Sequence, residues 1–476
     1  MPKDLRPLLD PETVAVIGAS AATHKPGHTL LRNVLDGGFP GRVYPVNPRG
    51  GEIAGLPAYA SIDAVPETVD LAFVVLGRAH VLGAVEACAA AGTRAVCIVT
   101  AGFAEGDTWG REEQDRITAV AESHGIIAIG PNTIGTISMG GRLLGSFVPF
   151  PHWEDGNVAI VAQTGIYAGA VALELMSQET QRIGITASVD IGNRVGIDEL
   201  DLLEEFAARD EAEVLGFYLE AFADARTFLA RAAEVKRDKP IVVLKPGRTQ
   251  HGARASASHT GSLAQDDAVV DQLLAQHGII RADDSEEFLA FLKALSRTPD
   301  GAGDRVGVVT YSGALGVMAT DRLVVEGLTI AEPAAETTAA IEALMPDWQS
   351  AGNPADLWSA VEVDPRASVE VGFGSMLADP GIDQVLGILL AVPNADFDGF
   401  GEAFAGLRAE HPGKPIHLVM HGAVRRSWLE QIDHLGIPVY DSVAQAVRAV
   451  RTVAQRQATR DDMPEAHAAG DTAAAR

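Results

Sequence analysis

Short apolar, β-branched runs alternate with longer amphipathic stretches along almost the whole chain. The first apolar run, Thr13–Ile17, precedes a stretch in which Leu30, Leu31 and Val34 recur at helical spacing. A Gly37-Gly38 pair then ends the predicted helix. Strands that alternate with helices are typical of βαβ units and of parallel sheets. The pattern therefore predicts an α/β protein.

Further strands are predicted wherever a similar apolar run ends in small or polar residues. They are Arg42–Val46, Leu71–Val75, Ala95–Val99, Val158–Val161, Phe217–Leu219, Ile241–Lys245 and Val306–Val309.

Proline- and glycine-containing segments at residues 148–156 and 298–301 divide this pattern into blocks, because they suit neither a helix nor a central strand. Three tandem domains are expected, at residues 1–147, 157–298 and 304–457. The polar, Ala-rich residues 458–476 are expected to form a disordered tail.

Each block opens with a strand, a turn of small residues and a helix. The turns are Gly18-Ala19-Ser20, Gln163-Thr164-Gly165 and Tyr311-Ser312-Gly313. Free backbone N–H groups at the start of a helix bind anions, so each turn is a candidate site for a phosphate group. An ordinary tight turn between strand and helix is the alternative at each place.

His259 stands out among the histidines because small and polar residues surround it at 254–263. This segment follows the predicted strand Ile241–Lys245 and is expected to be an exposed loop. A neutral imidazole is nucleophilic and can carry a covalent intermediate such as a phosphoryl group. The alternative is a surface histidine in a Ser-rich loop.

The composition argues against several classes of function, above all the binding of nucleic acids or membranes. The chain of 476 residues has 47% hydrophobic and 21% charged residues, and its formal net charge is −27. Nucleic acids and anionic membranes would repel such a chain, so we expect no nucleic-acid and no membrane partner. Its two cysteines, Cys88 and Cys97, lie in apolar surroundings and indicate neither a disulfide framework nor a zinc site. We expect a cytoplasmic enzyme without a metal site of its own.

The first block does not match the fingerprint of an NAD-binding domain. The turn after the first strand reads Gly18-Ala19-Ser20-Ala21-Ala22-Thr23 instead of G-x-G-x-x-G. The second strand leads to Asn47-Pro48-Arg49, without the carboxylate that holds the ribose of NAD. Arg49 would instead attract a phosphorylated ribose, which coenzyme A carries. A CoA-binding domain therefore fits better than an NAD-dependent oxidoreductase.

Together these features resemble the α subunit of NDP-forming acyl-CoA synthetases, relatives of succinyl-CoA synthetase. The segments that carry the resemblance are residues 16–20, 44–48, 100–105, 130–135, 163–165, 192–194, 219–220, 244–248, 258–262 and 352–357. The resemblance implies a CoA-binding Rossmann domain followed by two flavodoxin-like domains. It also implies a reaction in which a carboxylic acid, CoA and a nucleoside triphosphate give acyl-CoA, a nucleoside diphosphate and phosphate.

The resemblance implies a role for each site residue. His259 would carry the phosphate, and Glu220 would hydrogen-bond the far nitrogen of its imidazole. The residues implied to bind phosphate or CoA are Gln163, Thr164, Gly165, Gly18, Ser20, Asn47, Pro48, Arg49 and Asn132. Several positions depart from the family: Thr133 replaces a usual cysteine and Thr164 a usual serine, Arg49 a common lysine, and residues 76–77 and 313–316 also differ.

No segment resembles the ATP-grasp domain that supplies the ligands of ATP and Mg²⁺ in this family. We expect this domain on a separate β subunit, in an α₂β₂-type assembly. A non-catalytic CoA-binding regulatory module remains the alternative function. The sequence does not identify the carboxylic acid, and it leaves ATP and GTP open.

Overall fold

The computed structural model describes residues 3–150, 154–170, 172, 174, 183–260 and 266–461. Contacts divide the chain into two compact units, residues 1–283 and 284–476. Among the described residues, no helix has the length and apolar character that crossing a bilayer requires.

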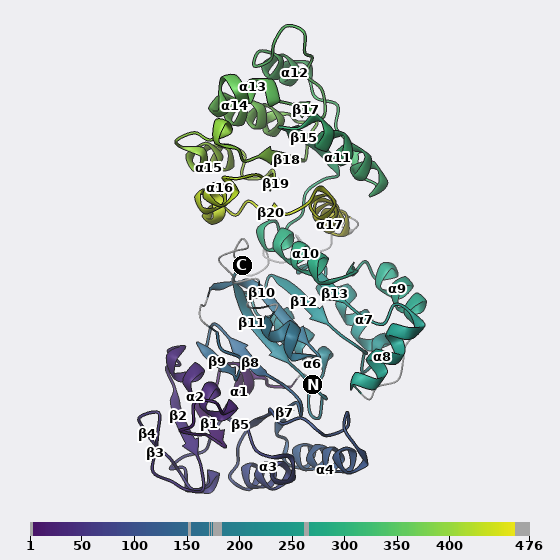
Figure 1. Cartoon of the computed structure of the whole chain (residues 1–476). Coiled ribbons are helices and arrows are strands. Elements are labelled where there is room, and N and C mark those ends of the chain that lie inside the picture. The colour runs from purple at the N-terminus through teal and green to yellow at the C-terminus, as the bar shows by residue number, and fades with distance from the viewer. Residues whose placement is uncertain are drawn as a thin grey trace, which may run out of the picture. The chain divides into compact units, whose positions relative to one another are not determined.

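The first sheet of unit 1 has five parallel strands in the order β2-β1-β5-β6-β7 (Figure 1). Its strands are β1 (Thr13–Ile17), β2 (Arg42–Val46), β5 (Leu71–Val74), β6 (Ala95–Ile98) and β7 (Ile127–Ile129). The accompanying elements are α1 (Arg6–Leu9), α2 (Pro26–Asp36), α3 (Val81–Ala90), α4 (Thr108–His124) and the hairpin β3 (Glu52–Ile53) with β4 (Leu56–Pro57).

The central strands of this sheet are buried along their whole length, as expected for a parallel sheet covered on both faces. Cys97 in β6 and Cys88 in α3 are both buried free thiols, which confirms them as small core residues.

The second sheet of unit 1 has seven strands in the order β14-β13-β12-β10-β11-β8-β9. They are β8 (Gly135–Ser138), β9 (Leu143–Ser146), β10 (Asp155–Ala162), β11 (Ile185–Asp190), β12 (Val214–Tyr218), β13 (Ile241–Leu244) and β14 (Ile280–Ala282). Its helices include the π-helix η3 (Ile166–Ala170), α6 (Glu199–Ala208), α7 (Ala225–Val235), α8 (Gln250–Thr260) and α9 (Asp267–Gln276).

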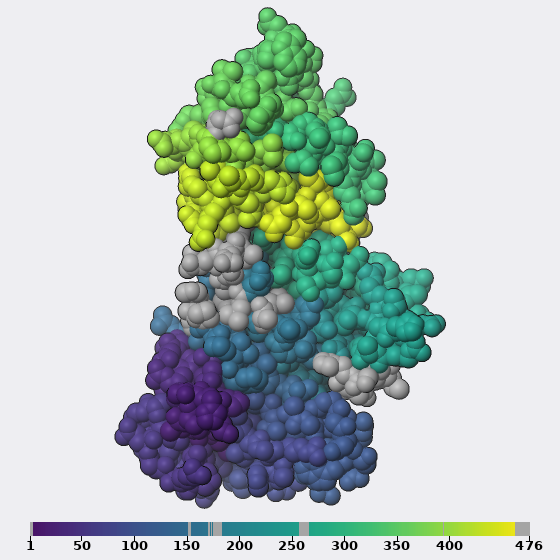
Figure 2. Space-filling view, viewed as in Figure 1, coloured from purple at the N-terminus to yellow at the C-terminus, as the bar shows by residue number. Residues whose placement is uncertain are grey.

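The antiparallel pair β8 and β9 belongs to the second sheet, although the sequence assigned residues 135–146 to the first block. Helix α2 of the first sheet packs on β9, and the Asn33 side chain of α2 donates to the carbonyl of Ser146 at 2.6 Å, so this pair ties the two sheets together. In Figure 2 the purple residues of the first sheet and the blue residues of the second form a continuous surface, as expected of one compact unit.

Unit 2 contains a sheet in the order β16-β15-β18-β19-β20, with β17 also paired to β15. Its strands are β15 (Arg305–Thr310), β16 (Thr329–Ile330), β17 (Ala355–Asp356), β18 (Gln384–Leu390), β19 (Ile416–His421) and β20 (Val439–Tyr440). Its α-helices are α10 (Ser285–Arg297), α11 (Gly313–Val325), α12 (Ala335–Glu342), α13 (Trp358–Val363), α14 (Pro365–Ala378), α15 (Phe400–Glu410), α16 (Arg425–Ile432) and α17 (Val443–Asp461).

Helix α10 lies beside α17 in unit 2 (Figure 1), although the sequence placed it at the end of the second block. Lys293 of α10 donates to the carbonyl of Val439 at 3.0 Å, and Arg448 of α17 pairs with Glu287 of α10. Helix α17 continues to Asp461, so residues 458–461 are helical where the sequence predicted the start of a tail. The rest of that tail lies outside the described residues.

The predicted α/β class is confirmed, and all three large sheets share one strand order. In each sheet, the parallel strand that comes first along the chain lies between two later ones: β1 lies between β2 and β5, β10 between β11 and β12, and β15 between β16 and β18. The second and third strands therefore lie on opposite sides of the first, which is the arrangement that opens a crevice at the carboxyl end of the first strand in α/β sheets. The three small-residue turns predicted from the sequence lie at these three places.

The expectation of a loop around His259 is wrong for residues 254–260, which belong to α8. The hydroxyl of Thr249 accepts a hydrogen bond from the N–H of Gly252 at 3.0 Å and so caps the first turn. Ala253 and Ala255 then favour the helix. Residues 261–263 of the expected loop lie outside the described residues.

The buried His417 in β19 predicts loss of stability in acid. Its side chain is 0% exposed, and burial lowers its pKa to about 3, with a smaller contribution from Arg408. In the unfolded chain the imidazole of His417 binds a proton below about pH 6.5, whereas in the folded chain it stays neutral until a much lower pH. The free energy of unfolding should therefore fall by about 1.4 kcal/mol per pH unit between about pH 6 and pH 4.

Thermal melting between pH 4 and pH 7, followed by the fluorescence of the buried Trp428 in the same unit, would measure this decrease in stability. The stability of the His417→Gln variant should depend less steeply on pH, whereas the exposed control His434→Gln should keep the wild-type dependence. An unchanged slope in His417→Gln would contradict the assignment.

Candidate active site

The carboxyl edge of the second sheet brings Gln163 and Glu220 together. Gln163 follows β10 and Glu220 follows β12, and these two strands are direct neighbours. The N–H of Gln163 donates to the carbonyl of Tyr218 at 3.0 Å, and its side-chain Oε1 accepts from the N–H of Ala221 at 3.0 Å. The predicted phosphate turn therefore directly supports the backbone on which Glu220 lies.

Glu220 is 7% exposed and faces helix α8. Its Oε2 lies 3.4 Å from the hydroxyl of Ser256 in α8, and its Oε1 lies 3.4 Å from the hydroxyl of Tyr218. His259 is three residues beyond Ser256 on the same helix, so the two positions share a helix face. The side chain of His259 lies outside the described part of the structure.

Three further side chains at this edge were not singled out from the sequence. The ring of Tyr218 stacks on that of Tyr167, with centroids 3.9 Å apart. Burial and the Glu220 carboxylate raise the pKa of Tyr218, so its hydroxyl keeps its proton. Burial lowers the pKa of Lys245, which is 3% exposed at the end of β13. Only the fold shows that these residues surround Glu220.

The phosphate turn also packs on the segment that follows β7. A Cβ added to Gly165 would come within 2.3 Å of Cγ2 of Ile134, which leaves no room for a side chain there. The N–H of Ile134 donates at 2.8 Å to Asp190, a fully buried carboxyl group at the end of β11. Burial raises the pKa of Asp190 to about 7 against the opposing effect of the N–H donors.

Thr133, which stands where the resemblance implies a cysteine, is 3% exposed. Its hydroxyl donates to the carbonyl of Asp190 at 2.6 Å and accepts from the N–H of Gly135 at 2.9 Å. These contacts give the hydroxyl a structural role that a thiol would fill less well, because sulfur is a weak hydrogen-bond partner.

The carboxyl edge of the first sheet holds most of the other predicted residues. Gly18 has φ +94°, and a Cβ there would lie 2.1 Å from the carbonyl oxygen of Val75. A Cβ on Gly27 would lie 2.2 Å from the carbonyl oxygen of Gly18. The two glycines let the turn and helix α2 pack closely, as in dinucleotide-binding turns.

Ser20 and Asn47 shape this turn. The Ser20 hydroxyl accepts from the N–H of Ala22 at 3.1 Å, and Asn47 donates from its side chain to the carbonyl of Ala19 at 2.8 Å. Pro48 and Arg49 are exposed beside it. A constrained turn next to an exposed arginine fits the diphosphate and the phosphorylated ribose of CoA.

Asn132 is separated from this group. It follows β7, at the other end of the first sheet, and has a left-handed backbone with φ +62°. Its N–H donates to the carbonyl of Thr100 at 2.9 Å. Asn132 thus lies in the segment that packs against the second sheet, whereas Gly18, Ser20 and Arg49 cluster around β1 and β2.

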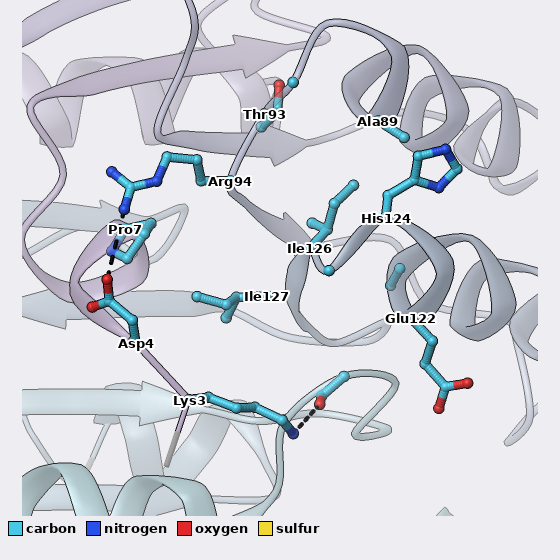
Figure 3. A pocket seen from close by; sticks show the side chains of 14 residues that line it. Lys3, Asp4, Pro7, Ala89, Thr93, Arg94, Glu122, His124, Ile126 and Ile127 are labelled. Carbon is cyan, nitrogen blue, oxygen red and sulfur yellow. Dashed lines mark hydrogen bonds and ion pairs between the residues drawn. The ribbon is translucent and has the colours of Figure 1, made fainter. Parts of the chain in front are cut away.

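A cavity of about 660 Å³ opens elsewhere in unit 1, near the amino-terminal ends of β6 and β7 (Figure 3). Two basic residues beside it already have acidic partners: Lys3 pairs with Asp201 at 2.8 Å and Arg94 with Asp70 at 3.2 Å. None of the site residues predicted from the sequence lines it. It lies at the amino edge of the first sheet, opposite the edge that holds the Gly18 turn.

Two family models match the chain. A CoA binding domain matches residues 12–139, and a succinyl-CoA ligase like flavodoxin domain matches residues 155–295. These ranges contain the two carboxyl edges described above.

Curated relatives are similar over most of the chain. The α subunit of acetate–CoA ligase [ADP-forming] I from Pyrococcus furiosus is 32% identical over 94% of this chain and 96% of its own length. Acetate–CoA ligase [ADP-forming] II from Archaeoglobus fulgidus is 33% identical over 94% of this chain, which spans 66% of that protein.

A solved structure is also similar. The dinucleotide forming acetyl-coenzyme A synthetase 1 of Ca. Korarchaeum cryptofilum, in complex with phosphate and ADP, aligns with a TM-score of 0.87 and 31% identity. The alignment covers 96% of this chain and 98% of that one.

Gly18→Ala should weaken CoA binding. The new Cβ would strike the Val75 carbonyl and would strain a positive φ, so the turn must shift. Strain of about 1–3 kcal/mol corresponds to a loss of affinity of about 5- to 160-fold, measurable by isothermal titration calorimetry. Gly83→Ala in α3 is the matched control, because its Cβ meets nothing within 4 Å and should leave binding unchanged. Wild-type affinity in Gly18→Ala would refute the role of this turn.

Proposed function

Because the chain belongs to the α subunits of the ADP-forming acyl-CoA ligases, which are acid–thiol ligases, we propose that it transfers phosphate through His259. A carboxylic acid, CoA and ATP would give acyl-CoA, ADP and phosphate. The observation that carries the proposal is the contact of the buried Glu220 with Ser256, one helical turn from position 259. It supports a histidine and a carboxylate that act as a pair.

His259 accepts and releases the phosphoryl group. Its neutral imidazole nitrogen attacks the terminal phosphorus of ATP, and the bond to ADP breaks. A carboxylate oxygen of the acid then attacks the phosphorus, so that histidine leaves and an acyl phosphate forms. The sulfur of CoA finally attacks the acyl carbon and phosphate departs, which completes the thioester.

Glu220 acts on the second imidazole nitrogen. A carboxylate that accepts the N–H there fixes the tautomer, so that the other nitrogen is free to attack. It also stabilises the positive charge that develops on the ring as the bond to phosphorus forms. Its low exposure, 7%, strengthens this interaction because little water screens it.

The turn of Gln163, Thr164 and Gly165 holds the phosphate near this pair. Its position after β10 directs backbone N–H groups toward the crevice at the carboxyl edge. The side-chain oxygen of Gln163 already accepts from Ala221. The side-chain NH2 of Gln163, the Thr164 hydroxyl and the backbone N–H groups are the donors that would contact the phosphate.

Residues of the first sheet bind CoA. Gly18 and Ser20 face its diphosphate, and Arg49, next to Asn47 and Pro48, attracts the phosphate on its ribose. Asn132 lies closest to the second sheet and so is suited to the acyl end of the molecule.

We also propose a partner. The similar Pyrococcus protein is named a subunit alpha, which supports a second subunit for this chain as well. A separate β subunit would therefore bind ATP and Mg²⁺ and complete an α₂β₂-type assembly in the cytoplasm, where both nucleotide and CoA are available. Acetate, which the named relatives use, is the first acid to test.

The phosphohistidine is tested directly with the chain, its ATP-grasp subunit, Mg²⁺ and γ-labelled ATP. Wild type should take up acid-labile, base-stable label, and His259→Ala should take up none. The neighbouring His251→Ala, in the same helix, is the matched control and should be labelled like wild type. Label that persists in His259→Ala would move the carrier to another residue, and no label in any chain would favour a non-catalytic CoA-binding module.

The need for a partner gives a second test. The purified chain should form no acetyl-CoA from ATP, CoA and acetate until the ATP-grasp subunit is added, as measured by chromatography of the thioester. Thioester formation by the chain alone would contradict the proposed division of labour.

A further inference from the structure

Arg194 has a backbone conformation that is uncommon for a residue with a side chain. It follows β11 and has a left-handed φ of +62°. Residues with a Cβ are strained in this region, where glycine is not. The side chain of Arg194 is only 17% exposed, so it turns into the protein instead of into water.

The guanidinium of Arg194 holds the loop that carries Glu220. Its Nη1 donates to the carbonyl of Ala221 at 2.9 Å and to Oε2 of Glu199 at 3.1 Å. The other oxygen of Glu199 accepts from the N–H of Ala223 at 2.5 Å. Two backbone groups that follow Glu220 are thus fixed by one buried ion pair.

Gln163 holds the same loop from the opposite side, because its side chain accepts from the N–H of Ala221. The peptide groups on either side of Ala221 are therefore both engaged, one by Gln163 and one by Arg194. Little freedom remains for the Glu220 backbone to rotate its carboxylate away from α8.

The segment of Arg194 is in turn tied to the loops of the first sheet. Asn193 and Val195 donate from their N–H groups to the carbonyls of Pro131 and Gly130, at 2.9 and 3.1 Å. The Asn193 side chain donates to Glu105 at 2.6 Å. Arg194 thus connects the loops at the CoA-binding sheet to the loop of Glu220.

We propose that Arg194 is a positioning residue that, through the carbonyl of Ala221 and the carboxylate of Glu199, holds Glu220 in place for phosphate transfer at His259. The proposal rests on the proposed function. Arg194 does not itself donate to Glu220, so its effect on the reaction passes through the backbone. It should therefore change the rate of phosphorylation and leave the affinity for CoA alone.

The test compares Arg194→Met with Arg194→Lys in the complex with the ATP-grasp subunit. Single-turnover labelling of His259 should slow by roughly 10- to 100-fold in Arg194→Met, the usual consequence of a small displacement of a catalytic group. Both contacts of Arg194 run to one nitrogen, so the ammonium of Arg194→Lys should restore most of the rate. The dissociation constant for CoA, from calorimetry, should be unchanged in both.

Arg209→Met is the matched control. Arg209 is also a largely buried arginine of unit 1, paired with Glu205 and Asp10, but it follows α6 at the other end of that helix from Asp198. Its loss should lower the melting temperature without slowing the labelling. If Arg194→Met does not fold by circular dichroism, the milder Arg194→Gln takes its place in the comparison with Arg194→Lys.

A double variant separates positioning from general weakening. In a Glu220→Gln background, where labelling is already slow, Arg194→Met should add little, because both changes act on one group. Equal slowing in both backgrounds, or a wild-type rate in Arg194→Met, would overturn this inference alone. Absence of label on wild-type His259 would overturn the proposed function and this inference together.

Discussion

Parallel pairing of strands determines where this chain can build a site. Every loop that follows a parallel strand reaches the same edge of the sheet, and the strand order then opens a crevice next to the first strand. Gln163 and Glu220 meet for this reason although 57 positions separate them along the chain. The same rule places Gly18 beside Asn47 in the first sheet. Burial of the strands supplies the stability, and the edge is left free for polar groups.

The strands of this fold were predictable from sequence because each is a short apolar run that ends at a turn. β1 and β2 have the predicted bounds, and β5, β6 and β13 each end one residue before the predicted end. The conformation of the segment around His259 was not predictable from sequence, because its small polar residues suit a loop or a helix equally well. A local cap at Thr249 decides for the helix. Strand-forming patterns are thus informative over a few residues, whereas Ser- and Ala-rich segments depend on their surroundings.

The supporting side chains of the site were beyond sequence analysis for a different reason. Thr133 and Asp190, or Arg194 and Ala221, meet only after two sheets have formed and packed, and nothing in their local sequence specifies the partner. Motif comparison named the residues expected to touch phosphate or CoA. It gave no role to Arg194 or Asp190, although both are more buried than Arg49. Long-range hydrogen bonds therefore account for most of what the fold adds.

The position of helix α10 shows that the boundary of the sequence family does not coincide with the boundary of the compact structural unit. The succinyl-CoA ligase like domain matches to residue 295 and so includes α10, yet contacts assign this helix to unit 2, where it lies beside α17. Its Phe288, Phe291 and Leu292 are buried. A fragment cut at the sequence boundary near residue 298 would take α10 away from α17 and expose apolar surface on both pieces. Isolated domains, and fusions that exchange them, should therefore be cut before residue 284.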